Sequence, residues 1–240
     1  MNKLHPIVSL GVILGGSFLV AAIIGAVTLF RIRALNDVVS VTGSAKMEVV
    51  SDQAKWRTQI MRTVRTSGLK SGYDQLAHDL VLVKQFMKEQ GIAEDQLVIS
   101  PVSMNEQYQQ DQAAEKIYTL TQSIEVQSTD VQLLAKASDN ISTLVGRGPI
   151  FSTQSLEYYY SKLPEARVQL LSQAIDDAKT RAGELAKNSG SKVGTLKSAS
   201  SGVVQVQSRN STDVSDYGSY DTSQINKQIT VTVKATFSLK

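Results

Sequence analysis

The first thirty residues form the most apolar stretch of the chain. Residues 7–30 contain no charged side chain. As a helix this run is about 36 Å long, whereas the hydrocarbon of a bilayer is about 30 Å thick. The pattern therefore predicts an N-terminal transmembrane helix within residues 1–33, which contacts the lipid bilayer through residues 7–30.

A cleaved signal peptide is the alternative interpretation of this segment. Ile32 and Ala34 loosely fit the small-residue pattern of a cleavage site. However, the apolar core is longer than the roughly 7 to 15 residues of a signal peptide, and Arg31 and Arg33 lie beside the site. An uncleaved anchor is favoured. Because the positive charges on its two sides balance, charge alone does not orient the helix.

After a linker at residues 34–37, the apolar positions alternate between the two-residue period of strands and the three- to four-residue period of helices. Strands are predicted at residues 38–50, 54–64, 96–109, 115–128, 149–160, 193–207 and 229–239, and helices at residues 69–90, 130–145 and 163–190. The third and fourth strands form a hairpin with its polar tip at residues 109–114. This order predicts an α+β domain over residues 38–240, with a largely antiparallel sheet packed with about three helices.

Side-chain patterns add detail to three of these elements. In the strand at residues 54–64, the predicted buried side carries Ala54, Trp56, Thr58, Ile60 and Val64, and the predicted solvated side carries Lys55, Arg57, Gln59, Thr63 and Arg65. In the helix at residues 69–90, the predicted buried stripe consists of Leu69, Tyr73, Leu76, Leu80, Val83 and Met87, and Gly91 is the predicted stop. Asp130 is the predicted N-cap of the next helix.

The longest of these three helices, residues 163–190, carries a cluster of charged side chains. Within nine positions it contains Asp176, Asp177, Lys179, Arg181 and Glu184. A stripe of apolar residues predicts its buried side: Leu163, Ala166, Leu170, Ala174, Ala178, Ala182 and Leu185. Asp177 and Arg181 have the spacing of a surface ion pair. Because nothing in the sequence buries either aspartate, we interpret the charges as the solvated face, not as paired catalytic carboxylates.

Other candidate chemistry lies in histidine and tyrosine side chains. His78 has no second histidine in the domain and is predicted to lie on a helix surface. Tyr158, Tyr159 and Tyr160 are consecutive, so no more than two share a side of a strand, and sheet packing is favoured over a stacking platform for bases or sugars.

Residues 208–223 are a polar segment that buries too little apolar surface to order itself. The sequence predicts a mobile loop or a segment ordered by a partner. Tyr217 and Tyr220 are its candidate contacts with a sugar or peptide.

Charge and composition exclude several classes of function. Residues 1–33 contain three of the 25 basic side chains and none of the 22 acidic ones, so residues 34–240 contain 22 of each. This neutral domain lacks the basic surplus of nucleic-acid binding, and no nucleic acid is predicted as a partner. The chain has no cysteine, which excludes disulfides, thiol nucleophiles and cysteine metal sites. No catalytic, cofactor-binding or metal-binding residues are predicted, because no nucleophile, phosphate-loop or metal-ligand motif is present.

Five segments together resemble the SIMPL domain family: "VSVTGSAKMEVVSDQAKWRTQI", "GIAEDQLVIS", "EKIYTLTQSIEVQSTD", "ARVQLLSQAIDDAKTRAGELAKNSGSKVG" and "ITVTVKATFSL". The resemblance covers about residues 38–240. The family tends to have Gly-x-Gly where this chain has Gly43-Ser44-Ala45, and Pro-Asp where it has Ser51-Asp52. The resemblance implies an extracytoplasmic domain associated with envelope integrity or oxidative stress, without established catalytic residues.

We therefore expect a single-pass protein of the bacterial inner membrane, with residues 34–240 outside the cytoplasm. Its predicted function is non-enzymatic, through homo-oligomerisation or through binding of an envelope protein or cell-wall partner. Small residues of the anchor are candidate helix-packing positions: Gly11, Gly15, Ser17, Ala21 and Gly25. The alternatives are a hydrolase with an unrecognised site, and a cell-wall ligand-binding module that uses residues 208–223.

Overall fold

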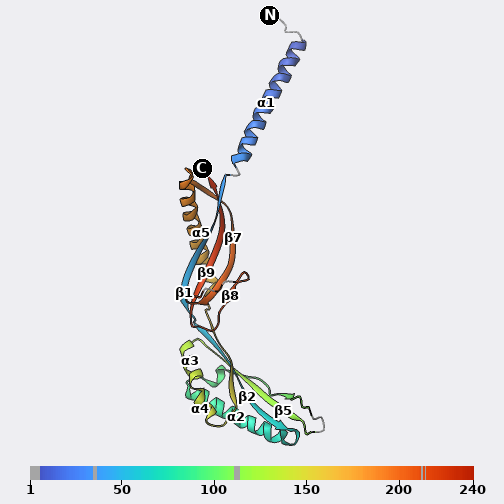
Figure 1. The fold of residues 1–240 in the computed structure, drawn as a ribbon, viewed down its shortest axis with the longest axis vertical. Coiled ribbons are helices and arrows are strands. Elements are labelled where there is room, and N and C mark those ends of the chain that lie inside the picture. Colours follow the sequence, from blue (N-terminus) through green and yellow to red (C-terminus); the bar gives the residue numbers. More distant parts are fainter. Residues whose placement is uncertain (1–5, 35–36, 111–113, 212, 214) are drawn as a thin grey trace. The chain divides into compact units, whose positions relative to one another are not determined.

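A computed structural model describes the backbone of residues 6–34, 37–110, 114–211, 213 and 215–240, and in the N-terminal helix the side chains of residues 10, 11 and 13–29. The helices are α1 (Pro6–Ala34), α2 (Leu69–Glu89), α3 (Val131–Asp139), α4 (Ile141–Val145) and α5 (Leu163–Asn188). The strands are β1 (Val38–Val50), β2 (Gln53–Arg65), β3 (Leu97–Ile99), β4 (Ser103–Glu106), β5 (Ile117–Ser128), β6 (Phe151–Tyr159), β7 (Val193–Ser208), β8 (Ser219–Tyr220) and β9 (Asn226–Leu239) (Figure 1). The mixed α+β class is confirmed, with two sheets in place of the one predicted.

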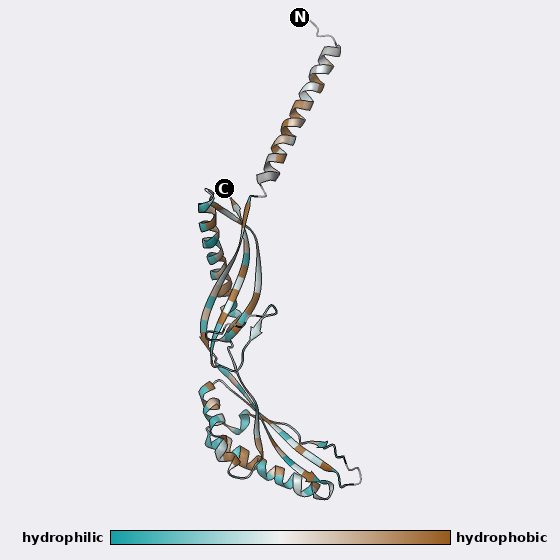
Figure 2. Ribbon diagram, in the orientation of Figure 1, coloured by the Kyte–Doolittle hydropathy of each residue, from teal (hydrophilic) through white to brown (hydrophobic). Residues whose placement is uncertain are grey.

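Helix α1 is continuous over the apolar run. Its described apolar side chains are exposed, for example Phe18 at 77%, and Figure 2 shows brown, hydrophobic residues along its length. Within the described residues, none of the helices combines the length and the apolarity that crossing a membrane requires.

The chain folds as two compact units. Unit 1 consists of Met1–Ala45, Gln169–Val203 and Val231–Lys240, and unit 2 of Lys46–Val168 and Val204–Thr230. The four-stranded sheet has the order β1-β9-β7-β8. The five-stranded sheet has the order β3-β5-β2-β6, and β4 also pairs with β5.

In unit 1, α5 packs directly on the four-stranded sheet through its alanines. Ala174, Ala178 and Ala182 are fully buried. Ala174 and Ala178 meet β1 at Gly43, where an added Cβ would lie 2.5 Å from the backbone nitrogen of Ala178 and closer still to the carbonyl oxygen of Ala174. A side chain larger than hydrogen therefore does not fit there. The predicted buried stripe is confirmed from Ala166 to Ala182, whereas Leu163 is half-buried, Leu185 is exposed and Ala186 is buried instead.

The strand β7 leaves a long edge of the four-stranded sheet open. Its partner β8 reaches only Gln205 and Val206. From Thr195 to Val203 every residue is exposed. Lys197 is the charged side chain in this stretch, so the edge is nearly neutral.

In unit 2, α2, α3 and α4 lie on one side of the five-stranded sheet (Figure 1). The strand β2 is central and antiparallel to both β5 and β6. Its alternate residues Ala54, Trp56, Thr58 and Ile60 are buried. They share a core with α2 and α3 residues such as Phe86 and Leu134, so the predicted alternation of β2 is confirmed.

The same buried side of β2 also carries an arginine, Arg62. Its Nε donates to Asp79 Oδ2 at 2.6 Å and its second guanidinium nitrogen donates to Oδ1 at 2.7 Å. The arginine also donates to the carbonyl oxygen of Gly148 at 3.1 Å. Asp79 is 2% exposed. The bonds to Asp79 raise the pKa of Arg62 above its usual range. This pair ties β2 to α2 and was not predicted.

Two predicted elements are interrupted. Residues 96–109 form β3 and β4, with a break at Pro101. The strand is interrupted because proline has no N–H to donate to the neighbouring strand. Next to the break, the Ser100 hydroxyl accepts a hydrogen bond from the backbone nitrogen of Ser123 at 2.9 Å. Residues 130–145 form α3 and α4, which meet at Asn140. Its carbonyl oxygen accepts from both the backbone nitrogen and the hydroxyl of Thr143. Of the predicted hairpin tip, residues 111–113 lie outside the described residues, as do linker residues 35 and 36.

Other predictions for the helices are confirmed with one exception. The stop of α2 at Gly91 has the expected left-handed backbone, with φ +86°. The helix α3 begins after Asp130, whose side chain accepts from the backbone nitrogen of Leu133. His78 is exposed as predicted. Tyr73, predicted to lie on the buried stripe of α2, is also exposed.

The Arg62–Asp79 pair predicts a large loss of stability when one partner is removed. Asp79→Ala leaves a largely buried guanidinium without its carboxylate and should lower the free energy of unfolding by about 3–5 kcal/mol. The measurement is urea unfolding of the full-length protein in detergent. Asp74→Ala is the matched control, because Asp74 lies on the same helix and pairs with Lys70 at the surface; its effect should be small. Equal effects of the two variants would contradict the structural role of the buried pair.

Candidate functional site

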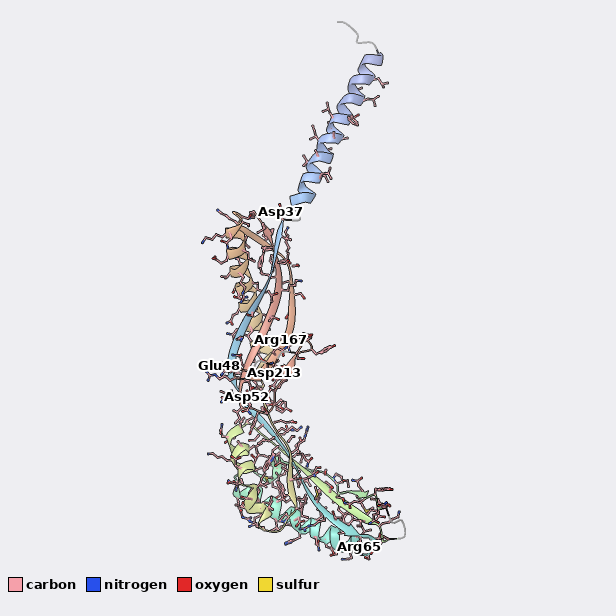
Figure 3. All side chains as sticks on the ribbon, in the orientation of Figure 1. Asp37, Glu48, Asp52, Arg65, Arg167 and Asp213 are labelled. Carbon is pink, nitrogen blue, oxygen red and sulfur yellow. The ribbon has the colours of Figure 1, made fainter. Side chains whose placement is uncertain are left out.

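Among the described residues of unit 2, the helices lie on one face of the five-stranded sheet and leave the other face uncovered (Figure 1). Because side chains of a strand alternate, the odd-numbered residues of β2 point to this face. Figure 3 shows Asp52 and Arg65 at the two ends of the strand. Cross-strand pairing places Lys55 between Glu157 and Gln127. We call this surface the open face.

Ion pairs fix the side chains at the centre of the open face. Glu125 accepts from Arg57 Nε at 3.0 Å and from the Gln127 amide at 2.9 Å, and its other contact is Lys55 Nζ at 2.8 Å. These bonds, led by that from Lys55, lower the pKa of Glu125 to about 2. Arg57 also lies 3.8 Å from Glu157. Two cations and two carboxylates therefore compensate one another on this surface.

A hollow of about 380 Å³ lies at the end of the open face. Its lining residues are Gln53, Ala54, Lys55, Gln127, Ser128, Thr129 and Tyr159. They come from the start of β2, the end of β5 and the end of β6. We call this cavity the Tyr159 hollow. Most of its side chains are uncharged and polar, and one is aromatic.

Tyr159 is held in place from two sides. Its hydroxyl donates to Glu157 Oε2 at 2.7 Å, and this bond raises the pKa of Tyr159. Its ring lies beside that of Tyr220, with centroids 5.9 Å apart and planes tilted by 36°. The Tyr220 hydroxyl in turn accepts from the backbone nitrogen of Tyr160 at 2.8 Å. The aromatic wall of the hollow therefore has one defined position.

The segment that carries Tyr220 is also fixed to unit 2. The backbone nitrogen of Asp221 donates to the carbonyl oxygen of Val206 at 2.8 Å, and the backbone nitrogen of Tyr158 donates to the carbonyl oxygen of Thr222 at 2.8 Å. Lys227 Nζ donates to the carbonyl oxygen of Asp221 and lies 5.6 Å from the centroid of the Tyr220 ring. Lys227 is 1% exposed, and burial lowers its pKa.

A second hollow, of about 360 Å³, lies farther along the same sheet. Its lining residues are Arg57, Thr58, Val98, Ser100, Ser123, Ile124, Glu125 and Gln154. Val98 is exposed. Arg57 and Glu125 thus line the second hollow, whereas Lys55, their ionic partner through Glu125, lines the Tyr159 hollow.

The candidate loop contacts occupy different environments. Tyr220 lies against Tyr159, next to the hollow, whereas the side chain of Tyr217 is 97% exposed. Of the predicted polar loop, residues 219 and 220 form β8, paired parallel with β7, and residues 212 and 214 lie outside the described residues. The predicted sheet packing of the consecutive tyrosines is confirmed for Tyr158, which is buried.

The candidate anchor positions lie along α1 without packing partners among the described residues. A Cβ added to Gly11, Gly15 or Gly25 would meet nothing within 4 Å. The Ser17 hydroxyl donates to the Leu14 carbonyl oxygen at 2.9 Å. Ala21 is exposed.

The charge cluster of α5 has a structural explanation. Asp176 is exposed. Asp177 pairs with Arg181 at 2.8 Å, as predicted, and accepts from the backbone nitrogen of Ser44 at 2.8 Å. The bond from Ser44, followed by that from Arg181, lowers the pKa of Asp177. The carboxylate thus links α5 to β1.

A hydroxyl and a carboxylate meet at Ser161 and Asp52. The Ser161 hydroxyl donates to Asp52 Oδ2 at 2.6 Å, and its backbone nitrogen donates to Oδ1 at 2.8 Å. Burial tends to raise the pKa of Asp52, but these bonds lower it below its usual range. A carboxylate with a lowered pKa is a weak general base, so the pair is suited to fixing a turn. Within the described residues, no cluster of His, Cys, Asp and Glu side chains fits a metal ion.

Sequence reasoning placed Lys55 and Arg57 on the solvated side of β2, but it did not find the hollow. The hollow depends on which residues of β5 and β6 lie opposite them, and this register is not encoded locally. The short polar stretch Gln127-Ser128-Thr129 at the end of a strand is the signal that was present.

These features define an α+β protein whose candidate site is a polar binding surface on a sheet. The chain belongs to the SIMPL family, described as a protein of unknown function (DUF541), which matches residues 39–237. Proteins of this family are generally exported or periplasmic. No curated protein matches the chain.

The lowered pKa of Glu125 predicts a pH-dependent part of the stability. Its contribution is present above its usual pKa of about 4.5 and is lost as pH falls from there toward about 2. Since the side chain is partly exposed, we expect a contribution of about 1 kcal/mol. Urea unfolding between pH 6 and pH 2 should show a weaker pH dependence for Glu125→Gln than for the unsubstituted protein. Glu106→Gln, which removes the more exposed pair with Lys116, is the control. An unchanged pH profile in Glu125→Gln would refute the assignment.

Proposed function

We propose that this protein is exported and acts in the bacterial cell envelope by binding an envelope component in the Tyr159 hollow. The observation that carries the proposal is the hollow itself, with its polar lining and an aromatic wall held by hydrogen bonds. Binding sites typically combine an apolar or aromatic surface with a few fixed polar groups. Because hydrogen bonds already hold the side chains of Tyr159 and Gln127, these two lose little conformational freedom when a ligand binds.

The proposed action is non-enzymatic. Nucleophilic catalysis needs a nucleophile within reach of an oriented base. In the described part of the chain, the close contact between Ser161 and Asp52 has the geometry of a turn, with both donors of Ser161 directed at the carboxylate. A hydrolase remains the alternative, and the second hollow, which contains Ser100 and Ser123, is the place where its activity would be sought.

We also propose the membrane location predicted from the sequence. The uncharged run of residues 7–30 and the continuity of α1 support an anchor, although no described helix meets the requirements for crossing a membrane. In this arrangement the N-terminus lies in the cytoplasm and residues 34–240 lie outside it. Association of α1 helices through Gly11, Gly15, Ser17, Ala21 and Gly25 would make the protein a homo-oligomer, because small residues allow helix backbones to approach. An association with envelope or oxidative stress would follow from the family resemblance alone.

Membrane fractionation checks the location. The protein should stay with membranes after carbonate extraction, and protease added to intact spheroplasts should degrade residues 34–240. Protection in intact spheroplasts with digestion after lysis would refute this orientation. Crosslinking in the same membranes should give fewer oligomers after Gly25→Leu combined with Ala21→Leu. Unchanged oligomers would exclude α1 from self-association.

Cosedimentation with isolated cell-wall sacculi tests the binding function. The full-length protein in detergent should sediment with sacculi, and Tyr159→Ala should reduce binding by about tenfold, the effect of losing one aromatic stacking contact. Tyr108→Ala is the matched control, since Tyr108 belongs to the same unit but is 90% exposed. Equal binding of the two variants would count against the hollow as the site.

A further inference from the structure

The lining of the Tyr159 hollow also indicates the chemical class of its ligand, and this inference rests on the proposed function. The charged group in the lining is Lys55. Its ammonium is already paired with Glu125 at 2.8 Å. Near the hollow, Arg57 adds a second positive charge and Glu157 a second negative charge. A ligand with a net charge of either sign would meet attraction and repulsion together, so the surface does not select ions.

The polar groups of the hollow suit a ligand with many hydroxyl groups. Gln53 and Gln127 each supply a carboxamide, which donates and accepts, and Ser128 and Thr129 supply hydroxyls. The Gln127 amide donates to Glu125, and the Ser128 hydroxyl accepts from the backbone nitrogen of Asp130. The hydrogen bonds among the described residues include none to the side chain of Gln53 or Thr129. Groups of this kind can bond to sugar hydroxyls in either direction, whereas a carboxylate or phosphate needs donors alone.

The tyrosine supplies a surface for the less polar side of such a ligand. The face of an aromatic ring is electron-rich, and the C–H groups on one side of a pyranose ring carry partial positive charge. Tyr159 is fixed through Glu157 and Tyr220, so its ring needs no ordering when a sugar stacks on it. The volume of about 380 Å³ is near the lower end of the usual range for ligand sites, which fits a short stretch of sugar units.

We propose that the Tyr159 hollow binds uncharged sugar units of a cell-envelope glycan. Tyr159 provides the stacking surface, and Gln53, Gln127 and Thr129 bond to the hydroxyl and amide groups of the sugar. Lys55 orients Gln127 indirectly, because both side chains contact Glu125.

Calorimetric titration of the full-length protein in detergent with a soluble, uncharged N-acetylglucosamine oligomer tests this proposal. We expect saturable binding whose affinity changes little between low and high salt, since no ion pair forms with the ligand. Tyr159→Ala should weaken binding by about tenfold or more. Gln53→Ala is the second variant, because Gln53 is exposed and its truncation should preserve the fold. Tyr108→Ala should bind like the unsubstituted protein.

The outcomes separate the sugar proposal from the proposed function. If sacculi bind through Tyr159 but the oligomer does not, and a free peptide of the cell-wall stem type does, the sugar proposal is overturned while envelope binding stands. Oligomer binding that falls steeply with salt, or that is unchanged in both Tyr159→Ala and Gln53→Ala, also overturns it. If neither sacculi nor the oligomer binds, the proposed function itself fails.

Discussion

The register of β2 between β5 and β6 is the constraint on which the candidate site depends. Trp56 and Ile60 are fully buried, and their burial fixes which residues of the two neighbours lie opposite β2. In the observed register Trp56 lies opposite Val126 and Leu156, and Lys55 consequently lies between Glu157 and Gln127 on the other face. A slip by one residue would exchange the two faces entirely. The core therefore positions the groups that line the Tyr159 hollow, and Ala54 belongs to both the core and the lining.

This arrangement explains why the site lies on strands and not on the polar loop. The groups of the hollow are held by backbone pairing and by the Glu125 network, while Arg62 and Asp79 join the same central strand to α2. Tyr220 is the contribution of the loop, and it acts behind Tyr159. Its segment is fixed because Lys227 and several backbone groups reach across to it.

Local periodicity was sufficient to predict the elements whose environment is simple. The alternation of β2 and the alanine stripe of α5 follow directly from side-chain period, and both are confirmed. The same reasoning missed the break at Asn140, whose carbonyl oxygen accepts from the backbone nitrogen and the hydroxyl of Thr143. It also passed over Arg62, an arginine in the buried register of β2, which was a signal for a buried acidic partner. To predict the hollow, the register of the strands would have to be known. To predict the position of Tyr220, its contacts with residues distant in the sequence would have to be known.

The open edge of β7 has a consequence for how the chain must be produced. From Thr195 to Val203 the strand has neither a proline nor a cluster of like charges to discourage pairing, which are the usual protections of an edge. Any extended chain that arrives before folding is complete can add to this edge as an extra strand. The yield of refolding should consequently fall as protein concentration rises, and dilution will favour the native sheet over mispaired aggregates.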